Sequence, residues 1–210
     1  LCPVPRNCDP PEPADTLRIH ERGTGQNPRA PLRSIPRIQA HKARIINPNI
    51  RIFEGALKAR VKNIAFNGTN AIGELDPETM AIRYFEIPDT RTRIRRLDIA
   101  TDGSIWFVNS SLGKIGRLNP NTGVVEQWNS PSGPNAHPYA LAVIDDVVWY
   151  NESGMRPDTL VRFDPASERF QSWAIPSGIG IIRHVWVTKD KNLLIHQSSS
   201  NRVGIVRIPR

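Results

Sequence analysis

One short phrase recurs four times along the chain, and this repetition constrains the fold more than any other feature. The copies read NAIGELDP at 70–77, GKIGRLNP at 113–120, DTLVRFDP at 158–165 and NRVGIVRIP at 201–209. Equivalent residues follow at intervals of 43, 45 and 43 positions, and they are Ile72, Ile115, Leu160 and Val203. A period in the low forties, with short strands and turn residues in each unit, is typical of β-propellers.

Each repeat reads as four short strands. In one unit, LDIA (97–100) and SIWFVN (104–109) flank a TDG turn, and KIGRL (114–118) and VVEQW (124–128) flank NPNTG. β-branched and aromatic residues favour strands, and Asp-Gly favours a hairpin turn. No window keeps the period of a helix among so many Gly, Pro, Asn and Asp residues. We therefore predict an all-β fold of four-stranded antiparallel blades, of the β-propeller type, with a period of 43–45 residues.

The repeats cover 61–210 and amount to about three and a half units, because residues before 60 contain no segment that resembles an inner strand. Aromatic residues keep step with the phrase and are interpreted as core between stacked sheets; they are Phe85, Trp128 and Trp173, with Trp106 and Trp149. A closed propeller usually needs at least four blades. We therefore expect an incomplete propeller, which self-association with a second copy or blades from elsewhere would complete.

Residues 1–60 differ sharply in composition from the rest. They hold nine of the 19 prolines, nine Arg and two Lys against five acidic residues, and one aromatic residue, Phe53. Such a segment cannot bury enough apolar surface to order itself, and we predict a basic tail that is disordered or a misread part of the sequence. Basic tails can bind nucleic acid, but without interleaved aromatic or glycine residues nucleic acid is not the expected partner.

Other sequence features bear on membrane contact, cellular location and zinc binding. No apolar run approaches the roughly 20 residues of a membrane span, so no membrane contact is expected. The chain starts with Leu and shows no basic-then-apolar leader, which favours a cytoplasmic location. Cys2 and Cys8 are the only cysteines, and two thiols without a Cys/His cluster make no zinc site.

The combination SIWFVN…KIGRLNPNTGVVEQW…SGPNAHPYALAV resembles the virginiamycin B lyase, or streptogramin lyase, family over roughly 62–208. The resemblance implies a seven-bladed propeller, of which about half is present. It also implies an antibiotic-resistance activity, in which a magnesium-assisted carbon–oxygen lyase opens the lactone of a cyclic depsipeptide by elimination. In that chemistry a His acts as base and a Glu of the same blade supports it. A neutral imidazole suits proton abstraction, and a divalent cation stabilises enolate charge.

Carried over to this chain, the resemblance points to two positions in each blade, at the start of the first strand and the end of the second. They are Leu97 and Asn109, then Tyr139 and Glu152, then His184 and Gln197. No blade holds both His and Glu, so we expect a composite site. His184 would be the base with Gln197 beside it, and Glu152 of the neighbouring blade would be the metal ligand for Mg²⁺.

The substrate, a cyclic depsipeptide or another lactone, would lie on a rim formed by Arg183, Tyr139 and His137. Arg95 and Arg96 fall at a first-strand entrance like that of Arg183, where they would receive an anionic or carbonyl-rich ligand or be exposed charges. Two other functions stay open at this point. The chain is a non-catalytic propeller that binds a protein, peptide or saccharide at its rim, or it is a truncated, inactive fragment.

Overall fold

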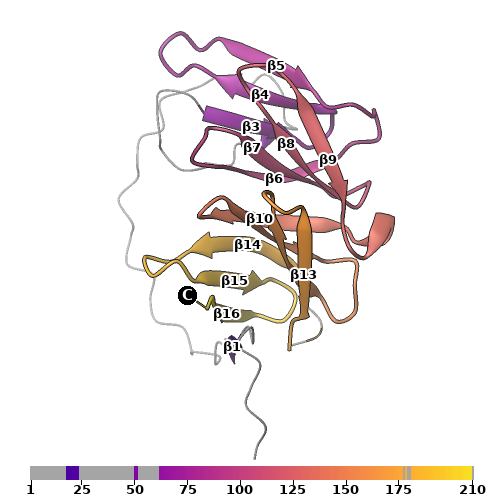
Figure 1. Ribbon diagram of the computed structural model, residues 1–210, viewed down its shortest axis with the longest axis vertical. Coiled ribbons are helices and arrows are strands. Elements are labelled where there is room, and N and C mark those ends of the chain that lie inside the picture. Colours follow the sequence, from indigo (N-terminus) through magenta and orange to yellow (C-terminus); the bar gives the residue numbers. More distant parts are fainter. Residues whose placement is uncertain (1–17, 24–49, 52–61, 177, 179–180, 210) are drawn as a thin grey trace, which may run out of the picture.

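The computed structural model describes residues 18–23, 50–51, 62–176, 178 and 181–209. Within these residues, sixteen strands form four antiparallel sheets of four strands each, which follow one another down the long axis of the molecule (Figure 1). We name the sheets blades A to D. The expected all-β fold of four-stranded antiparallel blades is confirmed. No helix in the described ranges has the length and apolarity to cross a bilayer.

Each blade is built from strands that follow one another along the chain, with one exception: the first described strand of the chain belongs to the last blade. Blade A contains β2 (Ile50–Arg51), β3 (Lys62–Phe66), β4 (Ala71–Leu75) and β5 (Ile82–Glu86). Blade B contains β6 (Ile94–Ile99), β7 (Ile105–Asn109), β8 (Lys114–Leu118) and β9 (Val125–Asn129). A single-turn helix, η1 (Gly133–Asn135), leads to blade C, with β10 (Pro138–Ile144), β11 (Val147–Glu152), β12 (Thr159–Asp164) and β13 (Arg169–Ala174). Blade D contains β14 (Ile182–Val187), β15 (Leu193–Gln197), β16 (Arg202–Arg207) and β1 (Arg18–Gly23).

The recurring phrase forms the third strand of every blade, namely β4, β8, β12 and β16. Its glycine has a structural reason in blade B. A Cβ atom on Gly116 would lie 2.2 Å from the ring of Phe107 on the adjacent strand, so only glycine leaves room for that ring. The repeat is therefore explained by packing within each blade.

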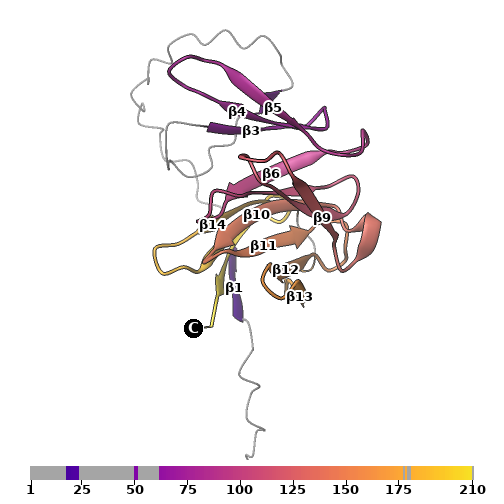
Figure 2. The same cartoon turned by 45° about the horizontal axis from the view of Figure 1, so that its top comes forward.

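Two strands come from the segment predicted to be a tail. β1 pairs antiparallel with β16, from Arg18 opposite Arg207 to Gly23 opposite Arg202, and gives blade D its fourth strand (Figure 2). β2 pairs with β3 and occupies the first position of blade A. Backbone hydrogen bonds to an open strand edge need no apolar pattern, so composition did not predict these strands. The rest of 1–60, with Cys2 and Cys8, lies outside the described residues, and the boundary at residue 60 stays a prediction.

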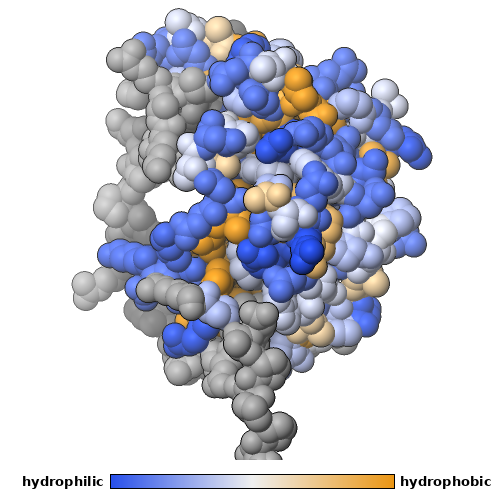
Figure 3. All heavy atoms as spheres, viewed as in Figure 1, coloured by the Kyte–Doolittle hydropathy of each residue, from blue (hydrophilic) through white to orange (hydrophobic). Residues whose placement is uncertain are grey.

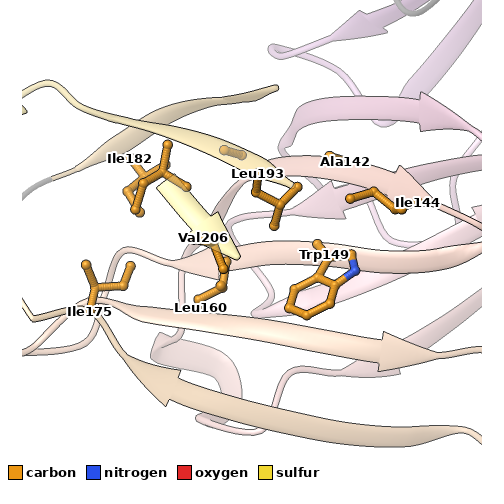
Figure 4. Close-up of a cluster of buried hydrophobic side chains, with 10 residues drawn as sticks. Ala142, Ile144, Trp149, Leu160, Ile175, Ile182, Leu193 and Val206 are labelled. Atoms are coloured by element: carbon orange, nitrogen blue, oxygen red, sulfur yellow. The ribbon is translucent and has the colours of Figure 1, made fainter. Parts of the chain in front are cut away.

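Three apolar cores lie between successive blades and hold them together. The core between A and B contains Ile72, Phe85, Leu97 and Phe107, and that between B and C contains Trp106, Leu141, Tyr150 and Phe163. The core between C and D contains Trp149, Leu160, Ile182 and Leu193 (Figure 4). Burying each of these side chains contributes about 1.5–3 kcal/mol. The expected role of the aromatic residues as core is confirmed, since Trp128 and Trp173 stack on Trp106 and Trp149.

The inner strands β6, β10 and β14 lie side by side, with β10 between the other two. Each has a bulge near its start, between Ile94 and Leu97, between Pro138 and Leu141, and between Ile182 and His184. A bulge adds one residue to a strand and re-aims the side chains beside it. We call the end of the blades with these bulges the site rim and the opposite end the far rim.

At the far rim, the hairpin turns of neighbouring blades are joined to one another. Asp146 accepts hydrogen bonds from the backbone N (2.8 Å) and Oγ1 (2.6 Å) of Thr101 in blade B. Lys191 of blade D reaches Asp145 with Nζ 2.6 Å from Oδ1. A hollow of about 490 Å³ lies beside this pair, lined by Ile144, Asp145, Lys189, Lys191, Ile208 and Pro209.

Candidate functional site

The three bulges place one residue of each inner strand at an equivalent point of the site rim. Leu97, Leu141 and Val185 occupy matching ladder positions, opposite Phe107, Tyr150 and Ile195. Two residues before them stand Arg95, Tyr139 and Arg183, and one residue before them stand Arg96, Ala140 and His184. The bulges thus bring three arginines, one tyrosine and one histidine from three blades to one rim.

The prediction that Leu97, Tyr139 and His184 are equivalent is therefore wrong by register. Part of the physical reason for Tyr139 is the hairpin that follows the inner strand. Blade C turns through two residues, Asp145 and Asp146, which both have positive φ (49° and 62°), whereas blade B uses the longer turn Thr101–Gly103. The hairpins of blades B and D have equal length, and His184 is offset because it lies 13 residues before Gln197, against 12 residues from Leu97 to Asn109.

The centre of the rim is the ring of Tyr139. The guanidinium carbons of Arg95, Arg96 and Arg183 lie 5.1, 5.6 and 5.8 Å from the centroid of that ring. Nη1 of Arg183 also lies 3.5 Å from the hydroxyl of Tyr139, at the limit of a hydrogen bond. We call these four residues the Arg–Tyr cluster. Cation–π attraction to one ring offsets part of the repulsion between the three like charges.

Arg96 links the outer two of these three blades. Its Nη2 donates to the backbone oxygen of Arg183 (3.1 Å) and lies 3.4 Å from Nε2 of His184. The residue that occupies the same ladder position in the blade between them is Ala140, which is buried and short. Ala140 belongs to the core between blades C and D.

His184 is half-buried and sits beside these cations. Its ring stacks on Trp186 with centroids 5.0 Å apart and an interplanar angle of 17°, and His196 is the next ring, at 6.5 Å. Burial, and then the charges of Arg96, His196 and Arg183, hold the pKa of His184 below its ordinary value. The imidazole is therefore neutral at pH 7, with a lone pair available to accept a proton or a hydrogen bond.

Glu152 is fully buried at the end of β11, and its carboxylate points to the loop after blade B. Oε1 accepts from Ser130 Oγ (2.6 Å) and Ser132 N (3.1 Å), and Oε2 accepts from Ser132 Oγ (2.6 Å). The contact between Glu152 and His184 that a composite site requires is not among the hydrogen bonds of this carboxylate. Its position indicates a structural role in fixing the loop from blade B to blade C.

The equivalent positions in the neighbouring blades behave alike. Asn109 is buried and bonds Thr92 and Gln127 through Nδ2, both at 3.2 Å. Gln197 is buried and accepts a hydrogen bond from Ser200 Oγ at 2.9 Å. A polar residue at the end of the second strand therefore anchors loops in all three blades, because buried polar groups must be hydrogen-bonded.

His137 lies outside the Arg–Tyr cluster, on the loop before β10. It is exposed and has a positive φ of 46°, and its Nδ1 lies 3.1 Å from the backbone oxygen of Ser110. Its own carbonyl accepts hydrogen bonds from Ser153 N and Oγ. His137 thus joins loops of blades B and C. Of the three residues expected at the substrate rim, Arg183 and Tyr139 lie next to each other, whereas His137 lies on a neighbouring loop.

The described residues do not offer the donor set that magnesium prefers. No group of three or more His, Cys, Asp or Glu side chains is close enough, in the part of the chain that the structure describes, to hold a metal ion. Mg²⁺ favours carboxylates with room for water, whereas Glu152 is enclosed by three donors.

The sequence pointed to all five residues of this rim, His184 included, but not to what connects them. Arg95, Arg96, Arg183 and Tyr139 stood out as entrance residues, but their meeting on one ring depends on bulges that spacing does not reveal. The partners of Glu152 were also missed. The available signal was the polar segment NSPSG at 129–133, where Ser130 and Ser132 supply hydroxyl groups next to a buried strand end.

Comparisons with known proteins identify the fold. No protein-family profile matches the chain, and no curated protein matches it in sequence. Among solved structures, it is similar to virginiamycin B lyase from Staphylococcus aureus, with a TM-score of 0.62 and 21% identity over 70% of this chain and 48% of the lyase. A streptogramin B lyase gives a TM-score of 0.63 and 21% identity, over 70% of this chain and 47% of the other.

Other propellers are similar at a lower level of identity. YCF48, solved bound to D1 peptide, gives a TM-score of 0.58 and 12% identity over 74% of this chain and 49% of that one. At such identities the comparisons show the propeller fold alone. The chain spans about half the length of the lyases that it matches.

Proposed function

We propose that this chain is a ligand-binding propeller whose site rim holds a carboxylate or phosphate group of a peptide, protein or saccharide. The observation that carries the proposal is the convergence of Arg95 and Arg96 from blade B and Arg183 from blade D on Tyr139 of blade C. Guanidinium groups bind carboxylates and phosphates with paired, charge-assisted hydrogen bonds. An anion would also relieve the repulsion between the clustered charges.

The access and polarity of the site support this reading. Arg183 is exposed, and its Nε donates to Ser198 Oγ at 3.0 Å, which orients the guanidinium beside Tyr139. The neutral imidazole of His184 adds an acceptor or a donor, according to its tautomer, next to the charged groups. YCF48 with its peptide illustrates that a propeller of this type can act by binding.

The test is a citrate titration of the full chain, with sodium chloride at matched ionic strength as control, followed by NMR of the His184 ring. Bound citrate neutralises the field of Arg96 and Arg183, so the pKa of His184 rises toward its ordinary value. Arg183→Gln should weaken citrate binding roughly tenfold, whereas Arg169→Gln, an exposed arginine on β13, should leave it unchanged. Binding without saturation, or an equal loss in both variants, would show that the rim does not bind anions.

A second candidate function is favoured by the state of His184. A neutral imidazole beside guanidinium groups can remove a proton next to a carbonyl, and the arginines would stabilise the resulting oxyanion. The substrate would be a cyclic depsipeptide lactone, opened by elimination of its carboxylate, with no water added to the product. Gln197, at the end of β15, would support the site.

Mass spectrometry separates this candidate from binding alone. Elimination leaves a linear product with the mass of the ring, and hydrolysis adds one water. A streptogramin B substrate would be incubated with the chain, with and without magnesium, and with His184→Ala. If no ring opens, or if His184→Ala leaves the rate unchanged, the lyase reading is wrong and binding at the rim stands on the citrate result.

A further inference from the structure

The side of blade D that faces away from blade C carries an apolar row, with His184 and His196 beside it at the site-rim end. Val185, Leu193, Ile195 and Val206 pack into the core between C and D, and alternate residues of a strand point to opposite faces. The opposite face therefore carries a cross-strand row of Trp186, Leu194 and Ile205. Trp186 is 49% exposed and Ile205 is 39% exposed. We call this row the open face of blade D.

Blades B and C use the same face as an interface. Trp106 and Trp149 occupy the ladder position that Leu194 occupies in blade D, and both are buried against the next blade. Trp106 belongs to the core with Leu141 of blade C, and Trp149 belongs to the core with Ile182 of blade D. The open face of blade D thus continues a series of blade–blade interfaces.

The contacts between blades also show which surface covers a face of this kind. It is the other side of the following blade, represented on the second strand by Phe107, Tyr150 and Ile195 in blades B, C and D. On the same side of blade A lies the row Ile64, Gly73 and Tyr84, since Ala65, Ile72 and Phe85 pack toward blade B. Ile64 is buried and Phe66 lies against Gly73, so Tyr84 is the exposed part of this row. Tyr84 is 62% exposed, with its ring 5.5 Å from that of Phe66. One chain therefore carries both halves of a blade–blade interface.

We propose that the open face of blade D docks on the Tyr84 face of blade A in a second copy of the chain. In a two-fold symmetric dimer, blade D of each copy packs on blade A of the other copy. These two equivalent contacts close a ring. Two copies of four blades give a ring at the upper end of the roughly four to eight blades that propellers use. This inference does not rest on the ligand at the site rim, although Trp186 of the open face stacks on His184 of that rim.

The test is the mass of the full chain by sedimentation equilibrium over a range of concentrations. The expected mass is twice the 23.6 kDa of one chain. Ile205→Lys places a charge in the buried contact and should raise the dissociation constant about 100-fold. Tyr84→Lys should do the same from the other side. Val124→Lys is the matched control, because Val124 is an exposed apolar residue on a turn of blade B.

Each outcome decides the proposal. Dimers lost in both Ile205→Lys and Tyr84→Lys, with circular dichroism unchanged, support the ring. A monomeric wild-type chain overturns it. Dimers lost in Ile205→Lys but kept in Tyr84→Lys would mean that blade D pairs with blade D, which also overturns the ring. If Ile205→Lys fails to fold, Tyr84→Lys on an outer strand keeps the test decisive.

Discussion

The two rims of this propeller hold their charged residues in opposite ways. At the far rim, opposite partners join neighbouring turns, as Lys191 joins Asp145 and Thr101 joins Asp146. The hydrogen bonds from the hydroxyl and backbone of Thr101 hold the pKa of Asp146 below its ordinary value. At the site rim, like charges gather around Tyr139, where Arg95 and Arg96 are half-buried and Arg183 is exposed. The far rim therefore joins neighbouring blades through opposite partners, whereas the site rim concentrates positive charge on one ring.

The site-rim feature with the largest expected effect on stability is Glu152. Glu152→Ala should lower the free energy of unfolding by about 2–4 kcal/mol, because Ser130 and Ser132 would lose a charged acceptor inside the fold. Urea unfolding without magnesium measures the effect. Glu126→Ala, which removes the exposed ion pair with Arg117, should cost about 0.5 kcal/mol or less. An equally small loss in Glu152→Ala would contradict a structural role for this carboxylate.

The next effect concerns Asp158, also at the site-rim end of blade C. Burial, partly offset by Arg156, raises the pKa of Asp158 to about 7. The pKa of Asp158 is higher in the folded than in the unfolded chain, so its protonated form adds to the free energy of unfolding. This contribution is full below about pH 4 and is lost as the pH rises through about 7. The loss is at most about 1.4 kcal/mol per pH unit. Asp158→Asn should remove this slope and be more stable than wild type at pH 8.

Thermal unfolding between pH 4 and pH 8 checks that prediction. Asp164→Asn is the matched control, since Asp164 lies in a half-exposed ion pair with Arg162 on the same strand. A wild-type stability that rises with pH across this interval, or a slope that survives in Asp158→Asn, would show that this carboxyl is not protonated in the fold.

The smallest effect belongs to the far rim. Asp146→Ala removes both contacts with Thr101 and should lower the unfolding free energy by about 1 kcal/mol. Lys191→Ala should lower it by about 0.5 kcal/mol or less, because both partners of this pair are exposed. Neither change should alter citrate binding. A far-rim variant that weakens citrate binding as much as Arg183→Gln would erase the distinction between the rims.

The repeat predicted the blades because strand, turn and core residues recur together at one period. It did not predict β1, because a strand at the edge of a sheet depends on backbone pairing, and Arg18–Gly23 lacks an apolar pattern. It also aligned Leu97 with Tyr139, partly because a hairpin shorter by one residue in blade C changes the count without changing the ladder. Contacts that depend on register therefore lay beyond the sequence.

The site was predicted in its residue types more than in its geometry. Arg183 and Tyr139 were expected at the rim, and they meet there. Glu152 looked like a ligand because a carboxylate at a strand end suits a metal, but three donors from the preceding loop enclose it. Those donors lie some 20 residues away along the chain, and only the packing of blade B against blade C brings them close.

The pairing of β1 with β16 also affects the order in which the molecule assembles. β1 precedes every other described strand and β16 follows them all, so their contact joins residues at opposite ends of the chain (Figures 1 and 2). Closing so long a loop costs more entropy than any hairpin, and contacts of this range slow folding. During synthesis, blades B and C can form before β16, the strand that pairs with β1, has been made. Blade D would then be the last blade to gain its fourth strand. The folded molecule shows a largely hydrophilic surface with separate apolar patches (Figure 3).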